Sequence, residues 1–176
     1  MIRKFHEETE PVSHTFFILR CKLGAQASQC PTDEMIIIGE KEFVHVQDLN
    51  MDYRARIDTG ATRTSLHAMN IEVLDGVEDL EANIGKQVRF ITANEMGEKH
   101  QHQAEIVAVR SIKNSLGTEV RYSIDMTIER AEKPKTVQVN LRDRGRMDDK
   151  ILIGRDWLNC DYLVDVSQNP TLSYAD

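Results

Sequence analysis

A short turn sequence carries the residues of this chain that are best suited to chemistry. Ile57-Asp58-Thr59-Gly60-Ala61 places a carboxylate directly after an apolar residue and two positions before a glycine. Glycine allows the backbone to turn tightly and keeps its N–H close to the carboxylate. The Thr59 hydroxyl can hydrogen-bond across a symmetry axis and hold two such turns rigid. Further along the chain, Ile151-Leu152-Ile153-Gly154-Arg155 supplies an apolar strand that would pack beneath the turn.

Hydrolysis of an amide by carboxylates needs two of them in one site. Like charges a few ångströms apart cannot both ionise, so the pair holds one proton and provides one base and one acid. Asp58 is the only aspartate in the chain that is followed by Thr-Gly or Ser-Gly. The second carboxylate therefore has to come from another copy, and a two-fold dimer places identical residues opposite each other at its axis. The sequence predicts a homodimer that acts on a peptide or protein substrate.

The elements that would position this turn are mostly short strands. Apolar alternation and β-branched runs, separated by turn residues, are typical of strands. The expected strands are residues 35–39, 43–46, 53–58, 87–93, 104–110, 120–129 and 136–141. One short helix is expected at residues 155–160. The predicted fold is all-β, a small closed antiparallel barrel with one short helix near the C-terminus. Residues 1–34 would form an N-terminal extension, 35–170 the barrel domain and 171–176 a tail.

Composition limits the classes of partner. The chain has 176 residues, 40% of them hydrophobic and 29% charged, which is ordinary for one globular domain. A net charge of −7 argues against nucleic acid as the main partner. No apolar run approaches the roughly 18 residues of a membrane span. Residues 15–19 are apolar but are followed at once by charges, which makes a poor signal-peptide core. A cytoplasmic location is expected, with export left open.

The three cysteines do not form a recognisable framework. Cys21, Cys30 and Cys160 include no C-x-x-C pair and have no neighbouring histidines. This spacing indicates neither a zinc knuckle nor a full set of disulfides. Cys21 and Cys30 could close a small loop if the chain were exported.

No cofactor is indicated by the motifs. The phosphate-binding sequence Gly-x-x-x-x-Gly-Lys-Ser/Thr is absent, as is His-Glu-x-x-His. The candidate metal ligands are His100 and His102, on one face of a strand, together with the distant His67 or His45. Two histidines at this spacing usually face solvent, so we expect no metal and no other cofactor.

An ordered set of motifs resembles a known family. The set comprises Ala55-Arg56-Ile57-Asp58-Thr59-Gly60-Ala61, Ser65-Leu66-His67-Ala68, Leu141-Arg142-Asp143-Arg144-Gly145-Arg146-Met147 and the segment 151–158. It is similar to a bacterial family labelled ATP-dependent zinc proteases, which is also classed as retropepsin-like. Some members of that family are encoded beside a ribosomal-protein glutamate ligase. The resemblance covers about residues 35–169.

The resemblance implies a retropepsin-type barrel with an aspartic-peptidase site. Asp58, Thr59 and Gly60 would be catalytic. Residues 151–155 would support the site from below. Thr62 and Arg63 stand where retroviral enzymes carry acidic residues that grip the substrate backbone. The nearest hairpin to a flap is residues 94–99, with a single glycine.

Substrate recognition is therefore expected to differ from the viral mode. The expected substrate-binding residues are Ala61, Arg63, His67, Arg142, Arg144 and Arg146. Arginines grip carboxylates by bidentate pairing, so a glutamate-rich peptide is the expected substrate. The alternatives are a hydrogen-bonded core histidine at position 67 and a solvated arginine loop.

Two other functions stay open. The barrel could be a catalytically silent module that binds an acidic peptide, or, more distantly, a zinc-dependent hydrolase. An acid pH optimum favours the aspartic mechanism, sensitivity to chelators favours zinc, and binding without turnover leaves the silent module.

Overall fold

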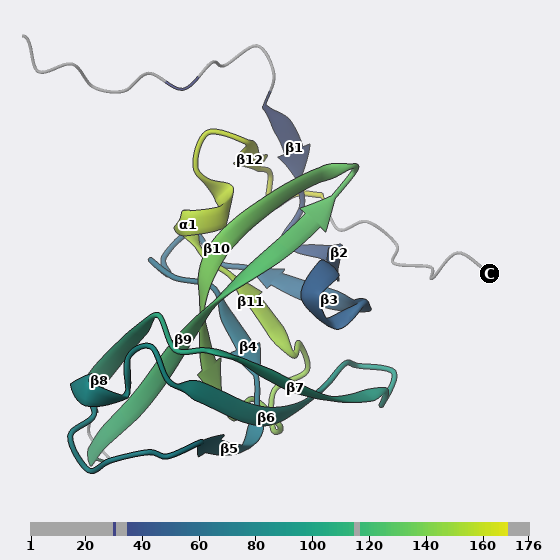
Figure 1. Ribbon diagram of the computed structural model, residues 1–176. Helices are drawn as coiled ribbons and strands as arrows, with labels where there is room; N and C mark the ends of the chain where they lie inside the picture. Colours follow the sequence, from purple (N-terminus) through teal and green to yellow (C-terminus); the bar gives the residue numbers. More distant parts are fainter. Residues whose placement is uncertain (1–29, 31–34, 115–116, 169–176) are drawn as a thin grey trace, which may run out of the picture. The chain divides into compact units, whose positions relative to one another are not determined.

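The computed structural model describes residue 30, residues 35–114 and residues 117–168, and strands dominate these residues (Figure 1). In chain order the strands are β1 (Ile36–Ile38), β2 (Lys41–Val46), β3 (Met51–Ile57), β4 (Ser65–His67), β5 (Met69–Val73), β6 (Gln87–Ala93), β7 (Lys99–Glu105), β8 (Ala108–Asn114), β9 (Gly117–Arg130), β10 (Lys133–Arg142), β11 (Ile151–Ile153) and β12 (Tyr162–Val164). The helical elements are the single-turn α1 (Arg155–Leu158) and the 3-10 helices η2 (Gln47–Leu49) and η3 (Glu81–Asn83).

Six strands close into a barrel. Their order is β10-β4-β11-β3-β2-β9, and pairing of β9 with β10 completes the ring, while β8 extends β9 beyond it. The predicted all-β closed barrel with one short helix near the C-terminus is confirmed. Most ladders around the ring are antiparallel, but β11–β3 and β10–β4 are parallel. The barrel is thus mostly antiparallel, with two parallel ladders.

Strand β11 separates the two strands that flank the Asp-Thr-Gly turn. It pairs in parallel with β3, with Ile153 opposite Ile57, and antiparallel with β4, with Ile151 opposite Leu66. The chain leaving β3 must therefore pass over the end of β11 before it returns as β4. This crossing positions Asp58 directly above the C-terminal end of β11.

The core follows from strand alternation. Along β2 and β3 every second side chain is buried, as expected for strands with one face on a core. Helix α1 closes one end through Trp157, which is fully buried and stacks on Tyr162 with ring centroids 4.1 Å apart. The Trp157 Nε1–H donates a hydrogen bond to the Ile128 carbonyl oxygen at 3.1 Å. The short helix is thereby fixed to β9.

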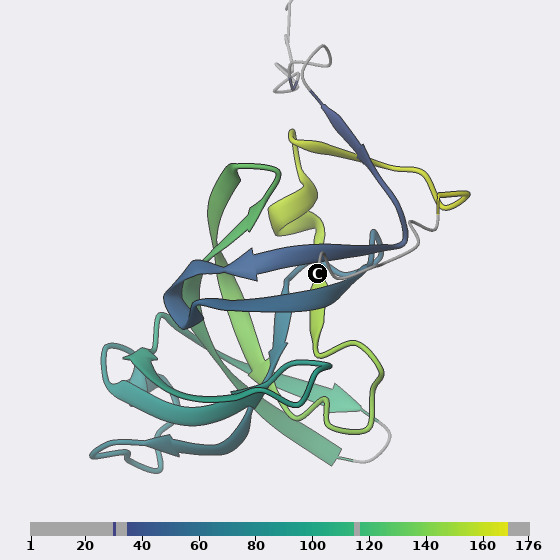
Figure 2. The same cartoon turned by 90° about the vertical axis from the view of Figure 1, so that its right-hand side faces the viewer.

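Two smaller sheets accompany the barrel (Figure 2). Strands β5, β6 and β7 form an antiparallel sheet, and β1 pairs in parallel with β12. The expected strand 87–93 coincides with β6, whereas the expected strand 104–110 is wrong. Strand β7 ends at Glu105 and β8 begins at Ala108. Strands β4, β5, β7 and β12 were not expected.

Part of the sequence-based interpretation lies outside the described residues. This holds for residues 1–29, including residues 15–19 and Cys21, and for the tail 171–176. Cys30 and Cys160 are each disulfide-bonded. Among the described residues no helix is both long and apolar enough to cross a membrane.

Candidate active site

The Asp58 carboxylate is fixed at the end of β3. The Asp58 backbone N–H donates to the Ile153 carbonyl oxygen at 3.0 Å, which ties the turn to β11. Its Oδ1 accepts hydrogen bonds from the backbone N–H groups of Gly60 (2.9 Å) and Ala61 (3.1 Å). No group within residues 35–114 or 117–168 hydrogen-bonds to Oδ2. Asp58 is half-buried and Thr59 and Gly60 are exposed, so one carboxylate oxygen is held while the other is available at the surface.

Thr64 joins the returning chain to the base of α1. Its hydroxyl accepts a hydrogen bond from the Gly154 N–H at 3.2 Å and donates to Asp156 Oδ1 at 2.9 Å. The Thr64 N–H also donates to the Asp156 carboxylate, at 3.0 Å to Oδ1. Thr64 is fully buried, so these bonds are shielded from water.

Arg155 ties the middle of the same loop to α1. Its backbone N–H donates to the Ala61 carbonyl oxygen at 2.9 Å, and its Nη2 donates to Thr62 Oγ1 at 3.0 Å. The segment from Asp58 to Thr64 is thus held at both ends and in its middle. A turn restrained in this way keeps the carboxylate in one orientation, as catalysis by a positioned group requires.

A cavity of about 740 Å³ lies beside this loop. Its lining residues are Ala61, Thr62, Arg63, Val109, Arg110, Ser111, Arg121 and Asn140. Three of these carry a positive charge, and none of the described lining residues is acidic. The hairpin of β8 and β9 forms one wall of this cavity. The hairpin at residues 94–99, expected from the sequence to be nearest to a flap, contributes no lining residue.

A row of arginines crosses the strands at this cavity. Arg110 and Arg121 stand directly opposite each other on β8 and β9, an arrangement of like charges that destabilises a sheet. Glu119 accepts a hydrogen bond from Arg121 Nη2 at 2.8 Å and pairs with Arg142 Nε at 3.3 Å. The hydrogen bond from Arg121 lowers the pKa of Glu119, which is therefore ionised. One carboxylate thus serves two arginines, and the surface keeps a net positive charge.

His67 and Arg144 form a buried pair behind this row. The Arg144 backbone N–H donates to His67 Nδ1 at 2.9 Å, and Arg144 Nε donates to the Asp149 carbonyl oxygen at 3.3 Å. Burial lowers the pKa of His67, which is 2% exposed, so the ring is neutral with its proton on Nε2. Burial also lowers the pKa of Arg144, while the negative charges of Asp149 and Asp58 raise it. Arg144 therefore lies within electrostatic reach of Asp58.

These features match one family of proteins along most of the chain. A model of the RimB-like family, described as the retropepsin-like aspartic endopeptidase RimB, matches residues 37–173. The chain belongs to this family. The resemblance to retropepsin-like proteins expected from the motifs is therefore confirmed, and the family is described as aspartic.

The solved and curated relatives of this RimB-like chain differ in extent. A crystal structure of the Legionella pneumophila protein Lpg0085, of unknown function, superposes with a TM-score of 0.60 at 27% identity, covering 77% of this chain and 96% of that one. Two proteins named probable alpha-L-glutamate ligase are each 29% identical, from Parasynechococcus marenigrum (strain WH8102) and Shewanella pealeana (strain ATCC 700345 / ANG-SQ1). The matches cover 74% and 78% of this chain but 28% and 30% of the ligases. The chain thus spans less than a third of the length of these curated relatives.

The structure brings some of the residues expected to bind substrate together and separates others. Arg63 lines the cavity, and Arg142 is linked to it through Glu119. Arg146 is exposed and forms no side-chain hydrogen bond or ion pair within the described part of the chain. Sequence reasoning missed Arg110, Arg121 and Asn140 of the lining and Thr64 beneath the loop. Polar residues at alternate positions 119, 121 and 123 of β9 were the one local signal of a polar strand face.

The hairpin at residues 94–99 has a structural role. Asn94 Oδ1 accepts hydrogen bonds from the N–H groups of Met96 and Glu98, which shapes the turn. The Glu95 carboxylate accepts hydrogen bonds from the backbone N–H groups of Arg54 and Lys150. The hairpin is therefore anchored to β3 and to the segment that leads into β11.

The histidines considered as metal ligands are dispersed. His100 and His102 are neighbours on β7, with ring centroids 6.0 Å apart, and His102 meets Phe90 edge-on. His45 pairs with Asp52 at 2.7 Å. In the part of the chain that the structure describes, no three His, Cys, Asp or Glu side chains gather in a way that could hold a metal ion.

Proposed function

We propose that this chain is one subunit of a homodimeric aspartic peptidase whose catalytic dyad consists of Asp58 from each copy. The observation that carries the proposal is the state of the Asp58 carboxylate. Two backbone N–H groups hold Oδ1, while Oδ2 is unengaged on an exposed turn. A half-site of this kind is complete only when a second carboxylate meets it, and two-fold symmetry supplies one.

The two carboxylates would share one proton. The ionised Asp58 takes a proton from water as the water oxygen attacks the peptide carbonyl carbon, and the protonated Asp58 donates its proton to the carbonyl oxygen. As the tetrahedral diol collapses, the C–N bond breaks, the protonated Asp58 gives its proton to the leaving amine, and the ionised Asp58 takes the proton of a diol hydroxyl, which restores the shared proton. The N–H groups of Gly60 and Ala61 hold Oδ1 in one position, so Oδ2 is the oxygen left to face the second carboxylate. The buried Ile153 beneath the turn keeps water from its lower side.

The substrate best suited to the cavity is a glutamate-rich peptide. Arg63, Arg110 and Arg121 line it, and none of the lining residues in the described part of the chain is acidic. The cross-strand pair of arginines costs stability in the free protein, and a bound carboxylate would relieve this repulsion. The ligases among the relatives are named for glutamate, which agrees with this substrate class.

The direct test of the dimeric dyad is to mix subunits. Wild type and Asp58→Asn chains are combined in equal amounts, allowed to exchange, and assayed on a glutamate-rich peptide. If both Asp58 residues are needed, activity falls to about one quarter of that of the same total amount of wild type. Activity of about one half would mean that each chain works alone and would contradict the dimeric site. Binding of the peptide without turnover by the wild type would leave the silent binding module.

Arg110→Gln separates binding from folding. Removing one member of the Arg110–Arg121 pair should raise the free energy of unfolding by about 0.5 kcal/mol, because like charges no longer face each other. The same change should raise KM for a glutamate-rich peptide about threefold to fivefold, with little change in kcat, since the ion pair grips substrate and transition state alike. Denaturant melts and steady-state kinetics measure the two effects.

Arg89→Gln is the matched control for this prediction. Arg89 is an arginine of β6 that pairs with Glu72 and does not line the cavity. Its replacement should leave KM unchanged. Equal KM values for Arg110→Gln and wild type would remove Arg110 from the substrate site.

A further inference from the structure

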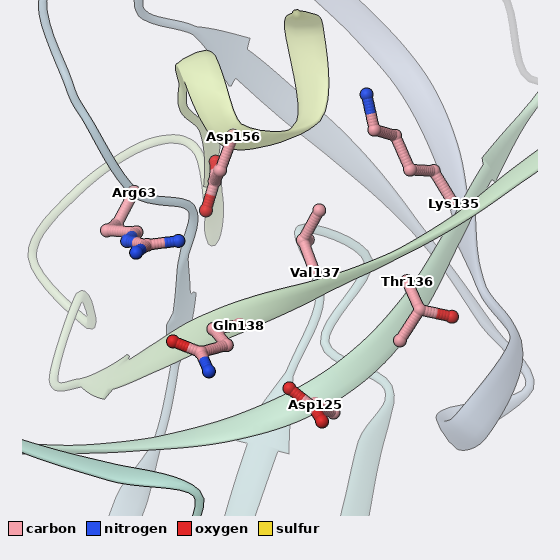
Figure 3. Close-up of a pocket in the computed structure, with 7 residues that line it drawn as sticks. All are labelled: Arg63, Asp125, Lys135, Thr136, Val137, Gln138 and Asp156. Carbon is pink, nitrogen blue, oxygen red and sulfur yellow. The ribbon is translucent and has the colours of Figure 1, made fainter.

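A second cavity, of about 410 Å³, lies between the Asp58 loop, α1 and the strands β9 and β10 (Figure 3). Its lining residues are Arg63, Asp125, Lys135, Thr136, Val137, Gln138 and Asp156. Arg63 lines this cavity and also the arginine-rich one. A chain that passes Arg63 can therefore reach both. The two cavities differ in charge, since this one includes two aspartates.

Several polar groups of the second cavity already have partners. Lys135 Nζ donates to the carbonyl oxygens of Trp157 (2.9 Å) and Asn159 (2.8 Å) and pairs with Asp161. Lys135 thus satisfies carbonyl groups at the end of α1. The Asp156 carboxylate is occupied by the hydrogen bonds from the Thr64 N–H and hydroxyl. Neither group is available to a ligand without loss of a contact that the fold uses.

Three polar groups remain. The side chains of Arg63, Asp125 and Gln138 form no hydrogen bond or ion pair within the described residues. Asp125 and Gln138 are directly paired across β9 and β10, so their side chains leave the same face of the sheet. Figure 3 shows this pair on one side of the cavity and Arg63 on another. The ionised carboxylate of Asp125 offers only hydrogen-bond acceptors, which suits an ammonium group.

We propose that the second cavity binds an ammonium group of the peptide, with Asp125 as its charged acceptor. The substrate site then has two ends: carboxylates bind among the arginines near β8, and a cation binds at Asp125 on β9, across the second cavity from α1 (Figure 3). This inference rests on the proposed function only for the view that the ligand is a peptide. The selectivity for a cation comes from Asp125 itself. The ammonium can belong to a lysine side chain or to the peptide amino terminus.

The expected size of the effect follows from exposure. Asp125 is exposed, so an ion pair there is screened by water and salt and changes affinity by about threefold. Because its side chain makes no contact that supports the fold, replacing it should not alter stability. Asp125→Asn keeps the shape and removes the charge, and Asp125→Lys reverses the charge.

The experiment measures binding of fluorescently labelled peptides by anisotropy. Four probes share a sequence of three glutamates followed by three alanines. Two of them end in lysine and two in norleucine. Of each two, one has a free amino terminus and the other is acetylated. A fifth probe has the lysine and no glutamate. The proteins are wild type, Asp125→Asn, Asp125→Lys, and Glu105→Gln as a control for net charge on an exposed strand residue outside both cavities.

The wild type and the Glu105→Gln control should bind one ammonium-bearing probe about threefold more tightly than its neutral partner. Comparison of the lysine probes with the norleucine probes tests the lysine ammonium. Comparison of the free with the acetylated probes tests the ammonium of the amino terminus. Asp125→Asn should abolish that preference without weakening the neutral probe, and Asp125→Lys should reverse it. Equal binding of all four glutamate probes by wild type, or a preference that survives in Asp125→Asn, overturns the proposal.

The outcomes also separate this inference from the proposed function. Failure of the acetylated norleucine probe to bind counts against the glutamate-rich substrate. If the probe without glutamate then still binds through Asp125, the ammonium site stands by itself. If no probe binds, both are overturned.

Discussion

Replacing Asp58 by asparagine should lower kcat/KM for a glutamate-rich peptide by several orders of magnitude while leaving the fold intact. The amide cannot take a proton from water, and it cannot hold the proton that the dyad shares. Loss of a catalytic group acting in the transition state commonly has an effect of this size. The fold is preserved because asparagine Oδ1 can accept the same hydrogen bonds from the Gly60 and Ala61 N–H groups.

Two measurements check this expectation. Peptide cleavage followed by mass spectrometry gives the rate, and a thermal melt gives the stability. Asp148→Asn is the matched control, because Asp148 is exposed and its side chain has no partner in the described structure. Activity of the Asp58→Asn protein within tenfold of the wild type would rule out the aspartic mechanism, whatever family the chain belongs to.

The fold could be predicted where the sequence pattern is local. Strand β6 follows from an apolar alternation bounded by turn residues, and its expected bounds are those observed. Strand β7 was missed because its sequence is largely polar and its residues are mostly exposed, so it shows no apolar alternation. Ile106 and Val107 continued the apolar pattern in the sequence, yet the chain bends there between β7 and β8. The bend depends on the sheets that each strand joins, and a local pattern does not report it.

The site could be predicted only in part, for the same reason. Asp58 and Gly154 belong to short motifs whose chemistry can be recognised without the fold. Arg110 and Arg121 are adjacent only because of the register of β8 and β9, which nothing in either segment specifies. Asn140 reaches the cavity because β10 lies beside β4 in a parallel pairing. Strand pairing thus created the basic wall of the cavity, and the motif supplied the Asp58 carboxylate.

Gly154→Ala should lower the free energy of unfolding by about 3 kcal/mol, which corresponds to a fall of about 10 °C in Tm for a domain of this size. A methyl group at this position would lie 2.6 Å from the Arg63 carbonyl carbon and 2.7 Å from its oxygen. These are backbone atoms, which cannot rotate away as the end of a flexible side chain would. The φ angle of Gly154 is −97°, which any residue can adopt, so the cost is steric rather than conformational.

The control for this prediction is a glycine with a left-handed backbone but with free space for a methyl group. Gly97 has a φ of +83°, and a methyl group there would meet nothing within 4 Å. Gly97→Ala should therefore lower stability by only about 1 kcal/mol, the cost of a left-handed backbone. Denaturant unfolding of both variants and the wild type gives the comparison. The clash would push Arg63 and the Asp58 loop away from β11. Gly154→Ala should therefore also lose activity at temperatures where it is still folded. A Gly154→Ala protein no less stable than Gly97→Ala would show that the Asp58 loop does not lie against Gly154 in solution.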